Sequence, residues 1–351
     1  MEKVRTRDFI YTTDDLFFAS TNYIHPEDRY ISFLRYIPNP NGDRLKNGKK
    51  YSKVDSTESY NYIRENHPEY LYFCENTNKE MMGVPINKVK KIIKPEKRLE
   101  EIRESFIGEN EIFSKLLSIA DFFHFKAGIS YENLGISGSI LPGLQKKEVS
   151  DIDFVIYGLL NHNKAIEAFK KYHNKEIDVN GNTIKLNKVN DDFWEKVYKK
   201  RIRDSSLSKD EFFFYEKRKF NRGLIDGTLF DILSTRNYDE VTEKWADVKY
   251  EPIGISKIEC TIEDALGAYD NPSRYKIKDL KVIEGIDEKI TEVVSFTHTY
   301  AGEVYEGEKA ICKGKVEKVI KNNGESSYQL VVGTTREAID EYIKLKDFPP
   351  K

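Results

Sequence analysis

The segment from residue 134 to residue 157 constrains the fold more than any other part of the chain. A short apolar run ends in Gly138-Ser139, and a charged loop leads to a second apolar run that carries Asp151 and Asp153. Successive side chains of a β-strand point to opposite faces, so these two carboxylates share one face. Adjacent carboxylates in an apolar strand repel each other unless a cation lies between them. We therefore expect two strands that together hold a metal ion.

The residue types of this segment favour nucleotide chemistry. Mg²⁺ prefers oxygen ligands and also binds phosphates. The backbone N–H groups of Gly138 and Ser139 can bind an anion. The alternative is an exposed edge strand with two solvated acids. The run Phe154–Tyr157 argues against that alternative, because it is typical of a buried strand.

This arrangement resembles the nucleotidyltransferase superfamily to which DNA polymerase β belongs. Its members carry Gly-Ser at the end of a strand, an Asp-x-Asp strand after a loop, and a third carboxylate on a later strand. The residues that match the first two features are Gly138, Ser139, Asp151 and Asp153. The resemblance implies a mixed α/β core around these residues.

Asp231 is the candidate for the third carboxylate. It lies in the middle of the apolar run Gly227–Leu233, and an isolated buried carboxylate is costly without a partner. The metal site at Asp151 and Asp153 is the natural partner. Asp226 competes for this role, but the adjacent Gly227 suggests a turn. The resemblance gives Asp231 a role in coordinating metal near the attacking hydroxyl and in general-base assistance.

The positive charge that a triphosphate needs has one candidate source. Lys217-Arg218-Lys219 and Arg222 precede the Asp231 strand, and we expect them to neutralise the leaving pyrophosphate or to grip the acceptor. The alternative is a solvated helix face. Many small members of the superfamily carry a basic residue soon after Gly-Ser, but here Ile140–Leu144 is apolar. The source of charge therefore stays open.

The resemblance implies transfer of a nucleoside monophosphate from an NTP, such as ATP, to an acceptor hydroxyl. Two Mg²⁺ ions, with Mn²⁺ as an alternative, would be held by the three carboxylates, and Gly138-Ser139 would cradle the phosphates. The overall layout also resembles predicted archaeal nucleotidyltransferases with no assigned substrate. RNA, DNA, protein and small molecules all stay open as acceptors.

Two other classes of function compete with this one. A nucleic-acid-binding protein could keep such a core without catalysis. A structural or interaction protein is favoured only if Asp151, Asp153 and Asp231 point away from one another.

Composition limits the remaining possibilities. A net charge of −2 with 33% charged residues excludes a uniformly basic coat. The scattered Cys74, Cys260 and Cys312 indicate neither a zinc site nor a disulfide framework. No run approaches the roughly 18 apolar residues of a membrane span. We expect a cytosolic protein that does not enter a membrane.

At 351 residues the chain is too long for one average domain. We predict an α+β protein with a small N-terminal α+β module (1–94), a nucleotidyltransferase core with a mixed sheet (95–240) and a β-rich, barrel-like C-terminal domain (241–351). Asp55 and Glu58 predict a helix cap. The basic run Lys88–Lys94 is interpreted as a solvated helix face. Thr334 and Glu337 predict the cap of a terminal helix that runs through residue 343.

Overall fold

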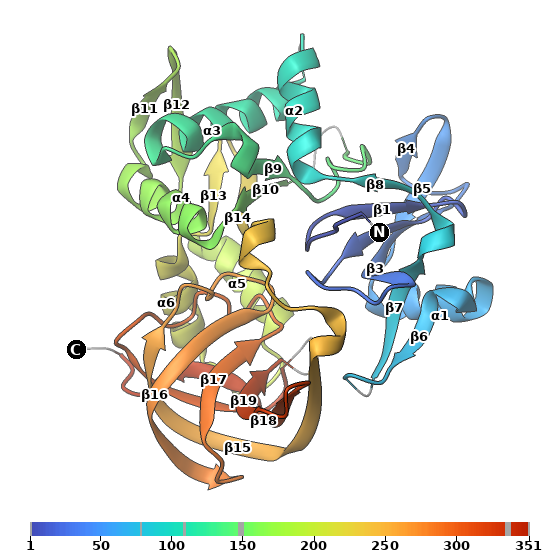
Figure 1. Cartoon of the computed structure of the whole chain (residues 1–351). Helices are drawn as coiled ribbons and strands as arrows, with labels where there is room; N and C mark the ends of the chain where they lie inside the picture. Colours follow the sequence, from blue (N-terminus) through green and yellow to red (C-terminus); the bar gives the residue numbers. More distant parts are fainter. Residues whose placement is uncertain (1, 78, 108–109, 147–150, 334–337, 350–351) are drawn as a thin grey trace. The chain divides into compact units, whose positions relative to one another are not determined.

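The computed structural model describes residues 2–77, 79–107, 110–146, 151–333 and 338–349, and the protein is α+β. The chain divides into two compact units (Figure 1). Unit 1 comprises residues 1–187 and 222–245, and unit 2 comprises residues 188–221 and 246–351. The predicted N-terminal module and most of the predicted core thus lie in one unit. Residues 188–221 join the predicted C-terminal domain.

The first sheet of unit 1 is built from the aromatic and β-branched segments near the N-terminus. Its strands are β1 (Phe9–Thr12), β2 (Phe17–Ser20), β3 (Arg29–Pro38), β4 (Arg44–Lys46), β5 (Lys49–Lys53), β6 (Leu71–Cys74), β7 (Lys79–Pro85) and β8 (Val89–Ile93). The order is β4-β5-β3-β2-β1-β8, with β7 pairing β3 and β6. Helix α1 (Ser56–Asn66) follows β5, and Asp55 and Glu58 form the predicted capping box.

The second sheet of unit 1 is the central one. Its order is β11-β12-β13-β14-β10-β9. The strands are β9 (Leu134–Ile136), β10 (Ile152–Tyr157), β11 (Glu176–Val179), β12 (Asn182–Asn187), β13 (Arg222–Ile225) and β14 (Thr228–Thr235). The helices are α2 (Pro95–Ser105), α3 (Glu111–Ala127) and α4 (Leu159–Tyr172). Strands β10 and β14 are parallel neighbours.

Helices α3 and α4 cover one face of the central sheet (Figure 1). Phe123 of α3 contacts Phe154 of β10, and Phe169 of α4 contacts Phe230 of β14, each with ring centroids 5.3 Å apart. Side chains alternate along a strand. The residue after Phe230 and the residue before Phe154 therefore belong to the opposite face, which is where the candidate carboxylates lie.

Unit 2 combines two helices with a barrel. The helices are α5 (Asp191–Arg201) and α6 (Lys209–Lys219), and the strands are β15 (Val248–Asp264), β16 (Ser273–Gly285), β17 (Ile290–Ser295), β18 (Lys309–Lys321), β19 (Ser326–Val332) and β20 (Tyr342–Leu345). The order β15-β16-β17-β19-β18 closes on itself, because β18 also pairs with β15. This is a five-stranded barrel of the kind the sequence predicts, with β20 added at β18.

Two predicted helical segments are strands. The basic run is strand β8, because Ile92 pairs with Ile10 of β1 and contributes to the core of the first sheet. The predicted terminal helix is wrong for its described part, where Ile343 of β20 pairs with Cys312 of β18. The predicted cap at Thr334 and Glu337 lies outside the described residues.

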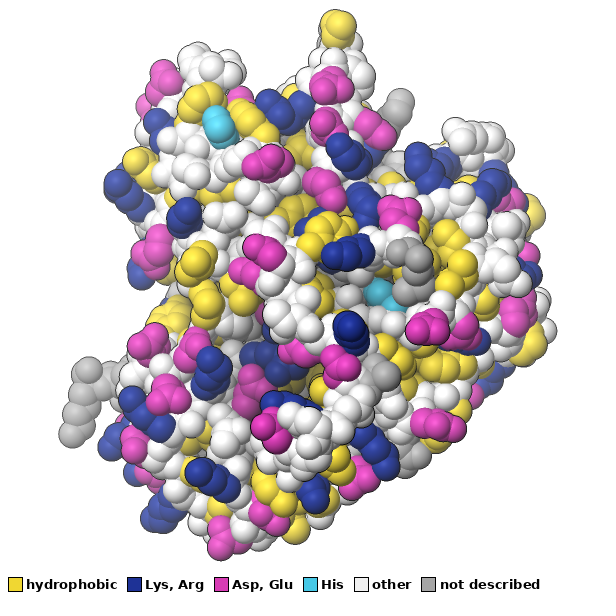
Figure 2. Space-filling view, in the orientation of Figure 1, with side chains coloured by type: hydrophobic (Ala, Val, Ile, Leu, Met, Phe, Trp, Pro, Cys, Tyr) yellow, Lys and Arg dark blue, Asp and Glu magenta, His cyan; other side chains and the backbone are white. Residues whose placement is uncertain are grey.

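Charge and hydrophobicity follow the composition. Dark blue and magenta side chains are interspersed over the face shown in Figure 2, without a field of one sign. No helix in the described ranges is long and apolar enough to cross a membrane.

Candidate functional site

The three predicted carboxylates lie on two neighbouring strands. Asp153 of β10 is in register with Asp231 of β14, and adjacent strands are about 4.8 Å apart. Asp151 directly precedes β10. Asp151 is exposed, whereas Asp153 and Asp231 are half-buried. The central sheet therefore brings these side chains to one place, on the face away from α3 and α4.

Negative charge dominates the electrostatics of this place and is only partly offset by nearby cations. Burial, and then the neighbouring Asp231, raise the pKa of Asp153 to about 6. Partial desolvation of its carboxylate, and then the neighbouring Asp231, also raise the pKa of Asp151. Neither side chain makes a hydrogen bond or ion pair with another described residue. A cation at this position would remove the repulsion between them.

Gly138 lies against the carboxylate of Asp153. Its φ of +62° is in the left-handed region, and a methyl group on its Cα would overlap the Oδ2 atom of Asp153. The backbone N–H of Ser137 donates to the carbonyl of Asp153 at 2.8 Å. A side chain at residue 138 would therefore strain the turn and displace the carboxylate. Ser139 follows Gly138 in this turn.

The apolar turn after Ser139 is a packing surface. Leu141 and Leu144 are buried in a cluster with four aromatic residues of the first sheet, namely Phe9, Phe17, Tyr36 and Tyr51. Arg44 also donates to the Leu144 carbonyl at 2.7 Å. A charged side chain in this turn would be buried among these rings, which explains why the turn carries no cation.

Arg222 lies at the site, and its partner is a carboxylate. It is the cross-strand neighbour of Asp231, and its guanidinium holds both carboxylate oxygens, with Nη2 at 2.7 Å from Oδ2. Arg222 therefore orients Asp231 and limits the freedom of its oxygens. Its predicted contact with a nucleotide stays a prediction.

The other three predicted cations make their contacts within unit 2. Lys217 pairs with Asp191 at 2.7 Å, Arg218 pairs with Glu308, and Lys219 pairs with Glu216 and Glu303 at 2.8 Å each. Lys219 is only 1% exposed. These ion pairs give each cation a role in unit 2, and their role in nucleotide binding stays a prediction.

Sequence reasoning missed two cations, namely Arg7 in the turn before β1 and Lys53 at the end of β5. The positive charge of Arg7 lowers the pKa of Asp153, and the positive charge of Lys53 lowers the pKa values of both Asp151 and Asp153. Neither residue belongs to a recognisable motif. Their contribution depends on the packing of the first sheet against the turn at residues 138–144, which spacing along the chain does not reveal.

The donor set suits Mg²⁺ or Mn²⁺ at Asp151 and Asp153, where the carboxylates offer oxygens without a described hydrogen-bonding partner. Asp231 would have to share its oxygens with Arg222. Among the described residues, the three carboxylates are not as tight a group as Asp14, His67 and Glu69, whose ligand atoms all lie within 4.8 Å of one another.

That tighter group already has a cation. Lys88 lies 3.1 Å from Asp14 and 3.2 Å from Glu69, so it supplies the charge that a metal would otherwise bring.

Comparison with known proteins includes a relative that matches nearly the whole chain. No protein-family model and no solved structure matches the chain. The uncharacterized protein MJ1086 of Methanocaldococcus jannaschii is 44% identical, over 98% of this chain and 99% of its own length.

Proposed function

We propose that this chain, which belongs to the same family as Methanocaldococcus jannaschii MJ1086, is a nucleotidyltransferase that moves a nucleoside monophosphate from an NTP to an acceptor hydroxyl. One observation carries the proposal. Gly138 packs against the carboxylate of Asp153, which is in register with Asp231 on a parallel neighbouring strand. This arrangement supports the proposal.

Each group of the site has a chemical task in this proposal. Asp151 and Asp153 hold the divalent ion, with Asp231 beside them. When bound, Mg²⁺ or Mn²⁺ supplies charge neutralisation for the triphosphate and the reacting oxygens. The N–H groups of Gly138 and Ser139 hold the phosphates, and Arg222 fixes the orientation of Asp231. The protein contributes positioning and electrostatic stabilisation, which are the main requirements of phosphoryl chemistry.

Transfer of label tests the proposal. Each α-³²P-labelled NTP is incubated with the protein, Mg²⁺ or Mn²⁺, and pools of RNA, DNA, protein or small-molecule acceptors. We expect label in one acceptor class, and at least about 100-fold less with Asp153→Asn. The matched control is Asp226→Asn, at an exposed turn residue with a φ of +45° that asparagine tolerates. The proposal fails if no NTP transfers label, or if Asp153→Asn retains the full rate.

A second candidate function rests on the barrel of unit 2. Closed Greek-key barrels of five strands include oligonucleotide-binding folds, and β15–β19 close in this way. A non-catalytic nucleic-acid-binding protein would bind RNA or DNA in the same assays without transferring label. Asp153→Asn would then leave the binding unchanged.

A further inference from the structure

A groove in the surface of unit 1 lies between the C-terminal end of helix α3 and helix α4. Its volume of about 590 Å³ falls within the usual range of ligand sites, roughly 300–1,000 Å³. The charged residues that line it are Lys126 of α3 and Lys164, Glu167, Lys170 and Lys171 of α4. Four lysines against one glutamate give the groove a net charge of +3, in a chain whose net charge is −2.

Most of this positive charge is not neutralised by the protein. Lys170 pairs with Glu167, with its Nζ 3.4 Å from Oε1. The side chains of Lys126, Lys164 and Lys171 make no hydrogen bond or ion pair with another described residue. A groove lined by one sign of charge concentrates ligands of the opposite sign. The groove between α3 and α4 is therefore suited to a polyanion.

The helix dipoles explain only part of this arrangement. Lys126 is in the last turn of α3, and Lys170 and Lys171 are in the last turn of α4, where a positive charge stabilises a helix. Lys164 is the sixth residue of the 14-residue helix α4, so it gains nothing from the dipole. Lys164 extends the positive charge of the groove to the middle of the helix.

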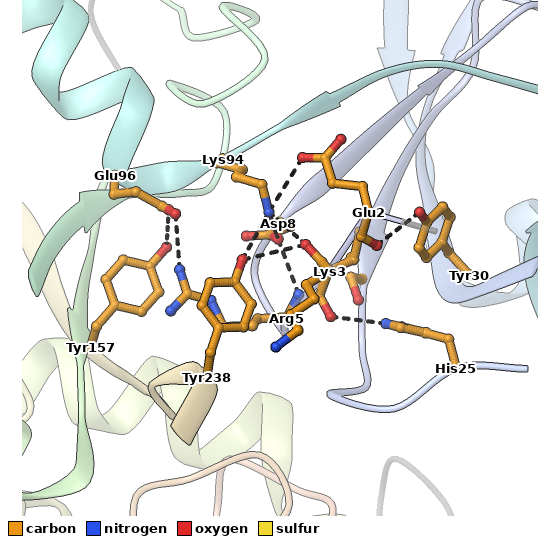
Figure 3. Close-up of polar contacts among 12 residues, drawn as sticks. Glu2, Lys3, Arg5, Asp8, His25, Tyr30, Lys94, Glu96, Tyr157 and Tyr238 are labelled. Atoms are coloured by element: carbon orange, nitrogen blue, oxygen red, sulfur yellow. Dashed lines mark hydrogen bonds and ion pairs between the residues drawn. The ribbon is translucent and has the colours of Figure 1, made fainter. Parts of the chain in front are cut away.

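The polar cluster at the N-terminus of unit 1 is arranged differently (Figure 3). There Arg5 pairs with Glu96 at 2.9 Å, and Lys94 lies 3.4 Å from Asp8. The guanidinium of Arg5 also lies 3.9 Å from the ring centroid of Tyr157. Those two cations have partners within the fold. Three of the four groove lysines have no acidic partner among the described residues, which leaves them to a ligand from solution.

The lysines of α4 have a spacing that suits a row of phosphates. Lys164 and Lys171 are seven positions apart, which is about 10 Å along a helix that rises 1.5 Å per residue. Their side chains share one face, because seven residues make almost two turns. Phosphates of one nucleic-acid strand follow one another at about 3.4 Å along the axis. The two lysines therefore span about three nucleotides.

We propose that the groove between α3 and α4 binds the phosphate backbone of a nucleic-acid strand through Lys126, Lys164, Lys170 and Lys171. The choice of nucleic acid among polyanions rests on the proposed function, for which RNA and DNA are candidate acceptors. Lysine ammonium groups contact phosphates as point charges and do not read bases. Binding at this groove is therefore independent of sequence.

The place of the groove limits which part of an acceptor it holds. Helices α3 and α4 cover one face of the central sheet, and the candidate carboxylates lie on the opposite face. The groove therefore binds a stretch of nucleic acid that is distant from the reacting hydroxyl. Only acceptors long enough to pass around the sheet use both places.

Salt-dependent binding of a fluorescein-labelled single-stranded RNA of about 20 nucleotides tests the site. Fluorescence anisotropy measures the affinity of the full chain at several salt concentrations. The double variant Lys164→Gln/Lys171→Gln should bind roughly 25-fold more weakly at about 0.1 M salt. Its slope of log K against log salt should be less steep by about 0.7 for each lysine removed, because each lysine releases the counterion of one phosphate.

The matched control is the double variant Lys50→Gln/Lys97→Gln. It removes the same charge from exposed positions on β5 and α2 of the same unit, and it should keep the affinity and the salt slope of the parent. Equal affinities of the two double variants for RNA overturn the inference, and so does a parent that binds no RNA.

Competition distinguishes nucleic acid from other polyanions. Neither polyglutamate nor vesicles of phosphatidylglycerol should displace the labelled RNA from the parent, whereas unlabelled RNA should. Displacement by polyglutamate would make the groove a site for acidic peptides, and displacement by vesicles would make it a membrane site. Either result overturns the assignment to nucleic acid.

The label-transfer assay separates this failure from failure of the proposed function. If the parent transfers label from an NTP while Lys164→Gln/Lys171→Gln binds RNA normally, the proposed function stands and the groove assignment is wrong. If RNA binding depends on Lys164 and Lys171 but no NTP transfers label, the groove assignment stands and the proposed function is wrong.

Discussion

Two carboxylates of unit 1 keep raised pKa values for the same reason, which is burial. Asp153 faces two other carboxylates, and Asp8 is fully buried beside Lys94, 3.4 Å away. Burial disfavours the charged form of each. For Asp8 the positive charge of Lys94 offsets only part of this effect, and its pKa is raised to about 7.

This raised pKa predicts how stability depends on pH. In the folded chain Asp8 binds its proton more tightly than in the unfolded chain, where its pKa is about 3.9. Its favourable contribution is therefore complete below about pH 4 and is lost as the pH rises to 7. Relative to Asp8→Asn, the parent should lose stability over this window, on the order of 4 kcal/mol at most.

Urea unfolding of both proteins at several pH values measures this difference. The asparagine can still accept the Arg5 N–H, so the hydrogen bond is preserved. A difference that stays constant from pH 4 to pH 8 would contradict the prediction.

At the scale of single residues, the sequence is informative where chemistry is local. Asp151 and Asp153 can be recognised by their spacing, and Asp231 can be recognised by its position inside an apolar run. Arg7 and Lys53 could not be identified in this way. They are ordinary surface-type residues until the first sheet packs against the turn at 138–144.

Among the elements, those with local signals were predicted well. The capping box at Asp55 begins helix α1 as expected. Local caps also begin the other two helices, with Ser208 at α6 and Asn190 at α5. Strands β8 and β20 were predicted as helical segments. Both pair with strands distant in sequence, β1 and β18, and the sequence around a segment does not reveal such a partner.

The turn that follows Ser139 provides a test at this scale. Leu144 is fully buried against aromatic residues of the first sheet. Leu144→Ala should lower the free energy of unfolding by about 2–5 kcal/mol.

Leu45→Ala is the control for this variant, since Leu45 on β4 is 64% exposed. It should leave the free energy of unfolding unchanged. An unchanged free energy of unfolding in Leu144→Ala would contradict the prediction.

On the scale of the whole molecule, the two units divide the chain in a way that linear domain boundaries do not describe. The chain passes between units after residues 187, 221 and 245. Helices α5 and α6 were assigned to the core because they lie between core strands in the sequence. Two residues that contact α6, Phe348 and Leu345, follow more than a hundred positions later.

The two tryptophans allow each unit to be followed separately. Trp194 lies in unit 2 and Trp245 in unit 1. In single-tryptophan variants, Leu144→Ala should lower the urea midpoint reported by Trp245. It should leave the midpoint reported by Trp194 unchanged. Val316→Ala, in the barrel, should do the reverse, since Val316 is fully buried there. Equal shifts at both tryptophans would mean that the units unfold as one.

The late partners of α6 have a consequence for synthesis on the ribosome. Tyr215 accepts the N–H of Leu345, 130 residues later, and Phe214 packs against Phe348. At typical elongation rates, on the order of 10 s pass between the synthesis of α6 and the synthesis of these partners. Strand β14 with Asp231 is translated well within that interval. Asp151, Asp153 and Asp231 have thus all been synthesised while the aromatic side chains of α6 are still exposed. We therefore expect chaperones to bind α6 first.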